Sequence, residues 1–276
     1  MTDRVWLITG ANSGFGKAFT EAAVAAGDVV VAAARRPDTL TELVAAHPGQ
    51  VEAVQLDVTD QAAGRAVVDG VIARHGRIDV LVNNAGRTHV GAAEETTEAE
   101  LRDLFEVHFF GPVELTRAAL PHMRARRSGA IVQLSSMGGQ MSFAGFSAYS
   151  ATKFALEGFS EGLAGEVGPL GIKVLIVEPG AFRTGLFGNA STSTELPDYA
   201  ATVGATRGMV GGGDGAQPGD PAKAAAAVIA ALESDHTPLR LPLGGDGLDA
   251  IVAHLDATRA EIDVWEKTIR ETTFDD

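Results

Sequence analysis

The 276-residue sequence contains no cysteine, and this absence removes several classes of function together. Disulfide bonds, thiolate metal sites and cysteine nucleophiles are all excluded. The seven histidines are scattered without the spacing of metal ligands, so we expect no metal site. The lack of cysteine is compatible with the cytoplasm, and this is the compartment that we expect.

Long apolar runs and an excess of positive charge are missing as well. The longest apolar stretches, such as 224–232, are far shorter than the ~20 residues that span a bilayer. The first expected strand begins near Arg4, which leaves no room for a signal peptide. The net charge of −14 argues against nucleic acid or an anionic membrane as a partner. We therefore expect an acidic protein that acts on a small molecule.

Short apolar runs alternate with helical patterns along the chain, which is typical of βαβ units. The expected strands are 5–8, 29–33, 51–56, 80–82, 130–134, 174–177 and 239–243. The expected helices are 14–26, 38–47, 60–75, 97–126, 148–168 and 221–233. We predict an α/β fold: a single Rossmann-type domain over residues 1–276, with a doubly wound parallel sheet of about seven strands and helices on both faces.

Two segments stand apart from this alternation. Residues 186–220 show little periodicity and many helix breakers, so they form either a surface insertion or a lid over the substrate. The lid interpretation rests on their place after the sixth strand, since ligands bind beyond the carboxyl ends of strands in such sheets. Residues 245–272 form an amphipathic, charged helical extension that we expect to pack on the domain or on a second subunit.

A glycine-rich turn follows the first expected strand and opens the first helix. Its residues are Gly10, Asn12, Ser13, Gly14, Phe15 and Gly16. A dinucleotide site needs such a tight turn, because the backbone must approach the pyrophosphate and the amides of the helix N-terminus must point at it. The spacing GxxxGxG differs from GxGxxG, but the mechanics are similar in this strand–turn–helix context. A purely structural glycine turn is the alternative.

The end of the second expected strand bears on the choice of cofactor. Arg35 stands there, 19 residues after Gly16 (35 − 16), and the nearest carboxylate, Asp38, comes only after Pro37. NAD-preferring sites often place an acidic residue at this point to bind the ribose. A guanidinium instead suits a 2′-phosphate. We predict NADP(H) as the preferred cofactor with NAD(H) as the second option, unless the arginine is merely solvated.

Tyr149 and Lys153 lie four residues apart, and residues at this spacing share one face of a helix. Reduction of a ketone needs a proton donor at its oxygen, and a free phenol titrates too high, near ~10. A nearby ammonium group favours the phenolate, so Tyr149 would act as general acid or base. Ser136 would hold the substrate oxygen. The alternative for the pair alone is an ordinary amphipathic helix, but Ser136 and the glycine turn favour catalysis.

With these motifs the chain resembles the short-chain dehydrogenase/reductase family, in particular the branch of bacterial relatives of 17β-hydroxysteroid dehydrogenases. The resemblance covers essentially the whole length. It rests on the glycine turn, Asp57, the Asn-Asn-Ala-Gly turn at 83–86, Ser136, Tyr149, Lys153, Pro179, Gly180 and Thr184. It implies a seven-stranded parallel sheet, assembly into homodimers or homotetramers, and hydride transfer between a nicotinamide and a carbonyl or alcohol.

The resemblance also implies roles for individual residues in cofactor binding. Asp57 and Val58 would contact the adenine. Asn83, Ala85 and Gly86 would line the cofactor and stabilise the sheet. Lys153 would hold the nicotinamide ribose in addition to its role in catalysis. Pro179, Gly180 and Thr184 would flank the nicotinamide carboxamide.

One position departs from the family pattern, because His108 stands where an asparagine completes a proton relay. Three interpretations remain open. The contact is made by the main chain at a helix distortion and histidine is tolerated; the imidazole itself carries protons; or the relay is broken.

These residues leave two main hypotheses of function. The first is an NADP(H)-dependent carbonyl reductase or alcohol dehydrogenase. Aromatic and apolar residues near the catalytic segments suggest an apolar substrate for it, although core packing explains any one of them equally well. These residues are Phe143, Phe146, Phe182, Leu186 and Phe187. The second is a catalytically silent dinucleotide sensor or scaffold, favoured only by His108. Sugar-nucleotide epimerase chemistry is a weaker third, because the chain is short for a second nucleotide-sugar domain.

Overall fold

A seven-stranded, all-parallel sheet forms the centre of the computed structural model, which describes residues 4–274. Its strands are β1 (Val5–Thr9), β2 (Val29–Ala34), β3 (Val51–Gln55), β4 (Val80–Asn83), β6 (Gly129–Leu134), β7 (Ile172–Pro179) and β9 (Arg240–Leu243). They are ordered β3-β2-β1-β4-β6-β7-β9. The predicted doubly wound α/β sheet is therefore confirmed, with strand bounds within two residues of those expected.

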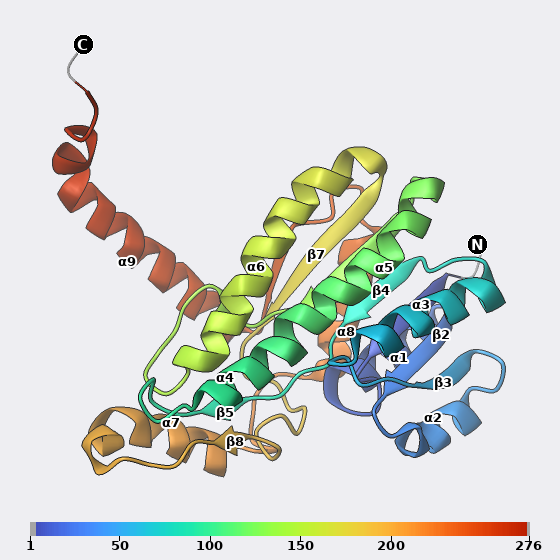
Figure 1. Cartoon of the computed structure of the whole chain (residues 1–276), viewed down its shortest axis with the longest axis horizontal. Coiled ribbons are helices and arrows are strands. Elements are labelled where there is room, and N and C mark those ends of the chain that lie inside the picture. The colour runs from blue at the N-terminus through green and yellow to red at the C-terminus, as the bar shows by residue number, and fades with distance from the viewer. Residues whose placement is uncertain (1–3, 275–276) are drawn as a thin grey trace.

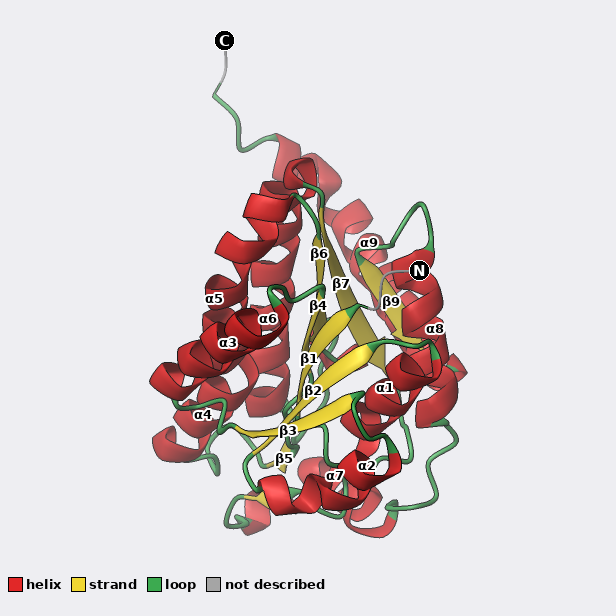
Figure 2. Ribbon diagram, turned by 90° about the vertical axis from the view of Figure 1, so that its right-hand side faces the viewer, coloured by secondary structure: helices red, strands yellow, loops and turns green. Residues whose placement is uncertain are grey.

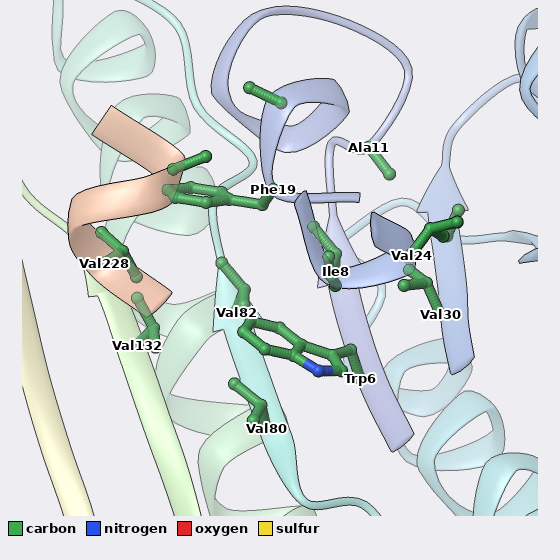
Figure 3. Packing of buried hydrophobic residues seen from close by; sticks show 14 of the residues in the cluster. Trp6, Ile8, Ala11, Phe19, Val24, Val30, Val80, Val82, Val132 and Val228 are labelled. Atoms are coloured by element: carbon green, nitrogen blue, oxygen red, sulfur yellow. The ribbon is translucent and has the colours of Figure 1, made fainter. Parts of the chain in front are cut away.

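Helices cover both faces of this sheet (Figures 1 and 2). One face carries α3 (Gln61–His75), α5 (Gly111–Arg126) and α6 (Ser147–Val167). The other carries α1 (Gly14–Ala25), α2 (Thr41–Ala46) and α8 (Pro221–Glu233). Because side chains alternate along a strand, Trp6 and Ile8 of β1 enter one core and Leu7 enters the other. Figure 3 shows the first core, where Phe19 of α1 and Val228 of α8 pack over the sheet.

The strand order reverses direction between β1 and β4. From β1 the chain moves outward to β2 and β3, and from β4 it moves the other way through β6 and β7 to β9. Ligands of such sheets bind in the crevice at this point, beyond the carboxyl ends of the strands. The turn after β1 and the turn after β4 both end there, so the fold itself places the two turns next to each other.

Residues 186–220 are more ordered in structure than their sequence indicates. They contain β8 (Ser191–Thr192), which pairs in parallel with β5 (His89–Val90), and α7 (Ala200–Gly212). The sequence missed α7 because four of its thirteen residues are glycine, which lowers intrinsic helix propensity. Burial of Val203, Thr206 and Val210 against the body stabilises the helix instead. In Figure 1 this segment lies at the carboxyl edge of the sheet.

The expected helix over 97–126 is divided into three parts. α4 (Glu98–Phe105) leads into a π-helical turn, Glu106–Phe110, and then into α5. A π turn inserts extra backbone into a helix and is frequent at functional sites. Glycine is required where the turn ends, because a Cβ on Gly111 would lie 2.6 Å from the carbonyl oxygen of Val58.

The last helix, α9 (Gly245–Arg270), is attached to the body only at its start. Gly247 and Ile251 are its buried residues, and every residue from 252 to 274 is exposed. Figure 1 shows α9 leaving the rest of the molecule. Packing on the domain thus accounts for the first turns only, and contact with a second subunit stays a prediction. Within residues 4–274, no helix combines the length and apolarity needed to cross a membrane.

Candidate active site

The turn between β1 and α1 has the geometry of an anion cradle. Gly10 and Gly14 have φ values of 63° and 51°, where side chains are disfavoured. A Cβ on Gly16 would lie 2.2 Å from the carbonyl oxygen of Gly10, so the turn admits only glycine there. The Ser13 side chain makes no capping hydrogen bond to α1, which leaves the first-turn amides available to an anionic ligand. These features fit the pyrophosphate of a dinucleotide.

The turn after β4 is braced directly against this cradle. The side-chain amide of Asn84 donates to the carbonyl oxygens of Thr9 (2.8 Å) and Gly10 (3.2 Å). The hydroxyl of Thr9 in turn accepts hydrogen bonds from the backbone N–H groups of Asn84 and Ala85, both at 3.0 Å. Asn84 therefore fixes the two turns to each other. Sequence reasoning missed it as a separate residue, because the pattern of the turn does not say which of its two asparagines faces the cradle.

Asn83, the other asparagine of this turn, is buried within the sheet. Its amide donates to the side chains of Gln133 on β6 (2.9 Å) and Thr116 on α5 (3.2 Å). These bonds support the sheet-stabilising half of its expected role, while contact with a cofactor stays a prediction. Gly86 lies close to His108, because a Cβ there would be 3.4 Å from the imidazole Nε2.

β6 and α6 bring Ser136, Tyr149 and Lys153 together. Ser136 follows the end of β6, and Tyr149 and Lys153 lie at the start of α6, buried to 9% and 5% exposure. Burial raises the pKa of Tyr149, and a hydrogen bond from Ser136 opposes this. The structure does not show the expected lowering of the Tyr149 pKa by the ammonium group of Lys153. The Nζ of Lys153 stands 5.8 Å from the centre of the tyrosine ring and donates to the carbonyl oxygen of Leu134 at 2.8 Å.

A buried carboxylate lies one helical turn beyond the lysine. Burial lowers the pKa of Lys153 to about 8, and the charge of Glu157 raises it. Lys153 thus remains largely protonated at neutral pH. Glu157 is itself held by Arg240 of β9, whose Nε donates to Glu157 Oε2 at 3.0 Å. Sequence reasoning missed Glu157, although its spacing of four residues from Lys153 was a usable signal.

Glu178 completes this acidic cluster behind the lysine. It is the residue before Pro179 on β7 and is 1% exposed. The amide of Gln140 donates to its carboxyl group at 2.8 Å, and Arg240 lies 3.6 Å away. Burial, and then the neighbouring Glu157, raise the pKa of Glu178 to about 7. Two buried carboxyl groups therefore share one guanidinium close to Lys153.

The other side of Tyr149 is apolar. Its ring belongs to a small core cluster with Phe146 and the buried Val203 of α7, and Phe143 and Phe187 pack against this cluster. The Phe146 and Tyr149 ring centroids are 5.6 Å apart. Three of the aromatic residues expected near the catalytic segments thus gather at the tyrosine. Phe182 does not, because it packs on Phe15 in the core over α1 and α8.

The proteins to which this chain is similar are named as dehydrogenases, reductases or oxidoreductases. The family described as short chain dehydrogenase matches residues 4–195. Oxidoreductase BOA17 of Botryotinia fuckeliana is 37% identical, covering 96% of this chain and 97% of its own. A 3-ketodihydrosphingosine reductase of Bacteroides thetaiotaomicron is 41% identical, covering 72% and 73%. A crystal structure of a short-chain dehydrogenase from Streptomyces avermitilis is 64% identical, covers 99% of both chains and superposes with a TM-score of 0.94.

The chain belongs to the short-chain dehydrogenase/reductase family. It is accordingly an NAD(P)-dependent oxidoreductase. Its relatives are assorted oxidoreductases of the family rather than members of a steroid dehydrogenase branch. Related structures hold either NADP or NAD, so family membership alone leaves the preferred cofactor open.

At the expected nicotinamide end of a short-chain dehydrogenase, the structure places Thr184 against the glycine turn. A Cβ on Gly14 would lie 2.9 Å from the Cβ of Thr184. Gly180 approaches α9 closely, since a Cβ there would be 2.7 Å from the carboxylate of Asp246. Pro179 ends β7 directly before it. The predicted residues are thus gathered at one edge, and their contact with the nicotinamide stays a prediction.

Two surface clefts differ in their relation to this site. A cleft of about 320 Å³ lies beside the glycine turn and is lined by Gly14, Lys17 and Thr184 among others. A larger one, of about 620 Å³, lies at the opposite edge of the sheet. Its arginines are already ion-paired, as in the 2.6 Å contact of Arg126 with Asp79. Position beside the glycine turn therefore favours the smaller cleft as part of the cofactor site.

The expected adenine end lies where β2 and β3 finish side by side. Arg35 follows β2 and is exposed, and the side chain of Gln55 at the end of β3 donates to its carbonyl oxygen. The carboxylate of Asp57 accepts hydrogen bonds from the N–H (3.0 Å) and hydroxyl (2.8 Å) of Thr59. Val58 is buried beneath them. Arg35 and Asp57 are thus positioned together, and their binding roles stay predictions.

His108 lies in the π-helical turn and is 1% exposed. Its Nε2 accepts the backbone N–H of Arg87 at 3.1 Å, and its Nδ1 lies 2.9 Å from the hydroxyl of Thr152. That hydroxyl donates its proton to the carbonyl oxygen of Tyr149 at 2.7 Å. Nδ1 must therefore carry the ring proton and donate it to the Thr152 hydroxyl. Nε2 already accepts a hydrogen bond, and the proton of the hydroxyl is used at the Tyr149 carbonyl.

This arrangement fixes His108 in one neutral tautomer. Burial, followed by the charges of Lys153 and Arg87, lowers its pKa well below the usual value. A second ring proton would break the bond from the Arg87 amide. The geometry favours the interpretation in which histidine is tolerated at a helix distortion, and it argues against an imidazole that carries protons.

Two buried side chains hold residues 186–220 to the body, and we call their contacts together the segment latch. The carboxylate of Glu95 binds Arg207 of α7 at 2.7 Å and accepts the backbone N–H of Leu196 at 2.8 Å. The imidazole of His89 lies 2.9 Å from the hydroxyls of both Ser191 and Ser193. Side chains that follow β4 thus bind the segment at four residues along its length.

Proposed function

We propose that this short-chain dehydrogenase reduces the carbonyl group of an apolar small molecule with NADPH, or oxidises the corresponding alcohol with NADP⁺. The observation that carries the proposal is the convergence of Ser136, Tyr149 and Lys153, with aromatic side chains packed on one side of the tyrosine. Ligand sites with such a lining bind an apolar body and present only a few polar groups to it.

The glycine cradle, Asn84 and Thr184 fit a dinucleotide, because the turn is so tight that a Cβ at Gly14 or Gly16 would collide with Thr184 or Gly10, and such a turn lets the backbone approach phosphates closely. The cofactor, when bound, supplies or accepts the hydride. Tyr149 gives a proton to the substrate oxygen during reduction, and Ser136 holds that oxygen by a hydrogen bond. Burial raises the pKa of Tyr149, so the phenol holds its proton until the substrate oxygen takes it up.

Lys153 keeps its charge at neutral pH with the help of Glu157. In the catalytic complex we expect its ammonium group to turn from the Leu134 carbonyl toward the ribose and the tyrosine, where it favours transient phenolate formation. His108 orders the peptide of Tyr149 through Thr152 and stays neutral throughout.

NADP(H) is our proposed cofactor because Arg35 is exposed at the end of β2. Among the described residues it has no carboxylate partner, so its guanidinium is available to a 2′-phosphate. Loss of such a charge-assisted contact costs roughly 10- to 100-fold in affinity. We expect Arg35→Ala to weaken NADPH binding by that factor while NADH binding changes little.

A ketone on a long apolar chain is the first substrate class to test. A 41% identical relative is named as a 3-ketodihydrosphingosine reductase, and the aromatic surroundings of Tyr149 suit such a chain. Steroid ketones are a second class for the test panel only, because the relatives form no steroid dehydrogenase branch. In either case residues 186–220 serve as a lid, since α7 supplies Val203 to the wall beside the tyrosine.

We rank the alternative of a silent sensor second. It rested on His108 as a broken relay, whereas this side chain makes two hydrogen bonds that order the residues around Tyr149. The complete set of Ser136, Tyr149 and Lys153 favours turnover.

The test is to titrate the protein with NADPH and NADH by nucleotide fluorescence and then to add 3-keto lipids, steroid ketones, aldehydes and quinones. Tighter binding of NADPH and its oxidation by an apolar ketone are expected. A kcat/KM that clearly favours NADH would overturn the cofactor assignment. Tight binding without turnover across the whole panel would revive the sensor.

A further inference from the structure

The exposed part of α9 carries a regular apolar seam. Leu248, Leu255, Ile262 and Ile269 follow one another at intervals of seven residues, and Trp265 lies three residues after Ile262. From Leu255 onward these four side chains are 51–62% exposed. A seven-residue repeat keeps them on one side of the helix, where a second helix packs in a coiled coil. We call Leu255, Ile262, Trp265 and Ile269 the α9 seam.

Such a seam is costly to leave in water. α9 rises by about 1.5 Å per residue, so the stretch from Leu248 to Ile269 forms a rod of about 32 Å. A lone helix of this length is marginal in water and gains most of its stability from packing of an apolar face. The interval of seven residues matches a straight helical partner better than an irregular surface. From these observations we propose that α9 pairs with the α9 of a second copy of this chain, in antiparallel orientation.

Charges beside the seam select the antiparallel orientation. With Leu248 at position a of the repeat, Arg259 and Glu266 occupy position e, and His254 and Glu261 occupy position g. A parallel pair brings position g against e of the other helix, which places Glu261 against the partner's Glu266. An antiparallel pair brings e against e, and Arg259 then meets the partner's Glu266 on both sides of the two-fold axis. Ile262 packs against the partner's Trp265 in the same register.

The attachment of α9 to the body favours the same orientation. The carboxylate of Asp246 accepts the backbone N–H of Ala181 at 2.8 Å, and Gly247 lies against Gly180. The root of the helix is therefore fixed to the loop after β7. A parallel pair would press the two bodies together at this root, whereas an antiparallel pair places them at opposite ends of the seam. The pairing is isologous, as in most homodimers.

The decisive experiment compares two β-branched residues that lie two positions apart on the exposed helix. Ile262→Glu puts a charge into the α9 seam. Val264→Glu makes the same kind of change at a residue that is 80% exposed but faces away from the seam. Sedimentation velocity of the full chain over a range of concentrations should show that Ile262→Glu halves the mass of the assembly and that Val264→Glu leaves it unchanged. A wild-type monomer, or equal masses for all three proteins, would overturn the proposal.

The orientation has its own test by reversal of charge. Glu266→Arg places like charges at the antiparallel contact and should weaken the assembly by roughly tenfold or more in Kd. The double variant Arg259→Glu/Glu266→Arg restores opposite charges and should recover wild-type assembly. A tighter assembly in Glu266→Arg alone would instead indicate a parallel pair, because the new guanidinium would then meet the partner's Glu261. Mass is measured in every case, so the result does not depend on the proposed substrate or cofactor.

Discussion

Two groups of buried polar side chains lie beyond the carboxyl ends of the central strands, and their bonding differs. In the segment latch, the carboxylate of Glu95 accepts two backbone N–H groups and one guanidinium, and these contacts lower its pKa to about 2. In the catalytic group, burial raises the pKa of Tyr149 and lowers that of Lys153 to about 8. Glu95 of the latch thus favours its charged form, whereas Tyr149 and Lys153 are destabilised in theirs.

The difference distinguishes buried charged groups that stabilise the fold from buried groups that transfer protons. A buried charge whose partners are all within the fold fixes that fold and does not exchange protons near neutral pH. In the catalytic group burial instead keeps Tyr149 a neutral phenol and brings the pKa of Lys153 down to about 8, so the protonation of both responds to charges that substrate and cofactor bring close. Substitutions in the two groups should therefore differ in what they change, and the largest effect is expected at the tyrosine.

Removal of the phenolic hydroxyl should affect chemistry alone. We expect Tyr149→Phe to lower kcat by roughly 10²- to 10⁴-fold, because it deletes the proton donor, while NADPH binding and the melting temperature stay close to wild type. The matched control is Tyr199→Phe, since these are the two tyrosines of the chain and Tyr199 donates only to Glu94 outside the catalytic group. Equal activity of both variants would contradict the catalytic assignment.

Loss of hydrogen-bond acceptors in the segment latch should weaken substrate binding and leave proton transfer unchanged. Glu95→Gln keeps the volume but cannot accept from Leu196, Ala92 and Arg207 together. We expect a rise of roughly tenfold in KM, with kcat at saturating substrate and NADPH affinity little changed, and faster proteolysis within 186–220. Glu94→Gln, at the exposed neighbour, is the control. A fall in kcat with KM unchanged would place Glu95 in the chemistry instead.

Acid sensitivity of the latch follows from the same carboxylate. Because the folded pKa of Glu95 lies below its unfolded value, its contribution to stability is present above the unfolded pKa. That contribution is lost as the pH falls toward about 2. The latch should therefore stay closed throughout the neutral range.

The sequence predicted the parts of this molecule that depend on local spacing. The glycine turn, the strand bounds and the placement of Tyr149 one turn before Lys153 each follow from a short stretch of chain. The acidic cluster does not, because Gln140, Glu157, Glu178 and Arg240 come together only through the order of the strands and α6. α7 escaped prediction because packing, rather than propensity, stabilises a helix rich in glycine.

The carboxylate behind the lysine should tune the alkaline limit of activity. Lys153 loses its charge as the pH rises through about 8, and Glu157 opposes this loss. We expect Glu157→Gln to shift the alkaline limb of kcat/KM for ketone reduction to lower pH. The rate should fall roughly three- to tenfold at pH 8.5 and less than about twofold at pH 6.5.

Glu161→Gln is the control for that shift. Glu161 lies one turn further along α6 and binds the same Arg240, but its side chain is 61% exposed. It should leave the profile unchanged. An identical shift in both variants would mean that the effect comes through Arg240 rather than through the charge next to Lys153.

The smallest expected effect concerns Glu178, whose pKa is raised to about 7 from a usual value near 4.5. The folded protein holds this proton more tightly than the unfolded chain, so the stability that it contributes below pH 4.5 is lost as the pH rises through about 7. Glu178→Gln cannot ionise and should gain in melting temperature over wild type between pH 5 and pH 8.5, by about 3 °C. Glu161→Gln should show no such change. If the difference in melting temperature between wild type and Glu178→Gln stays constant with pH, Glu178 is already ionised in the folded protein. It then behaves as Glu95 does in the segment latch.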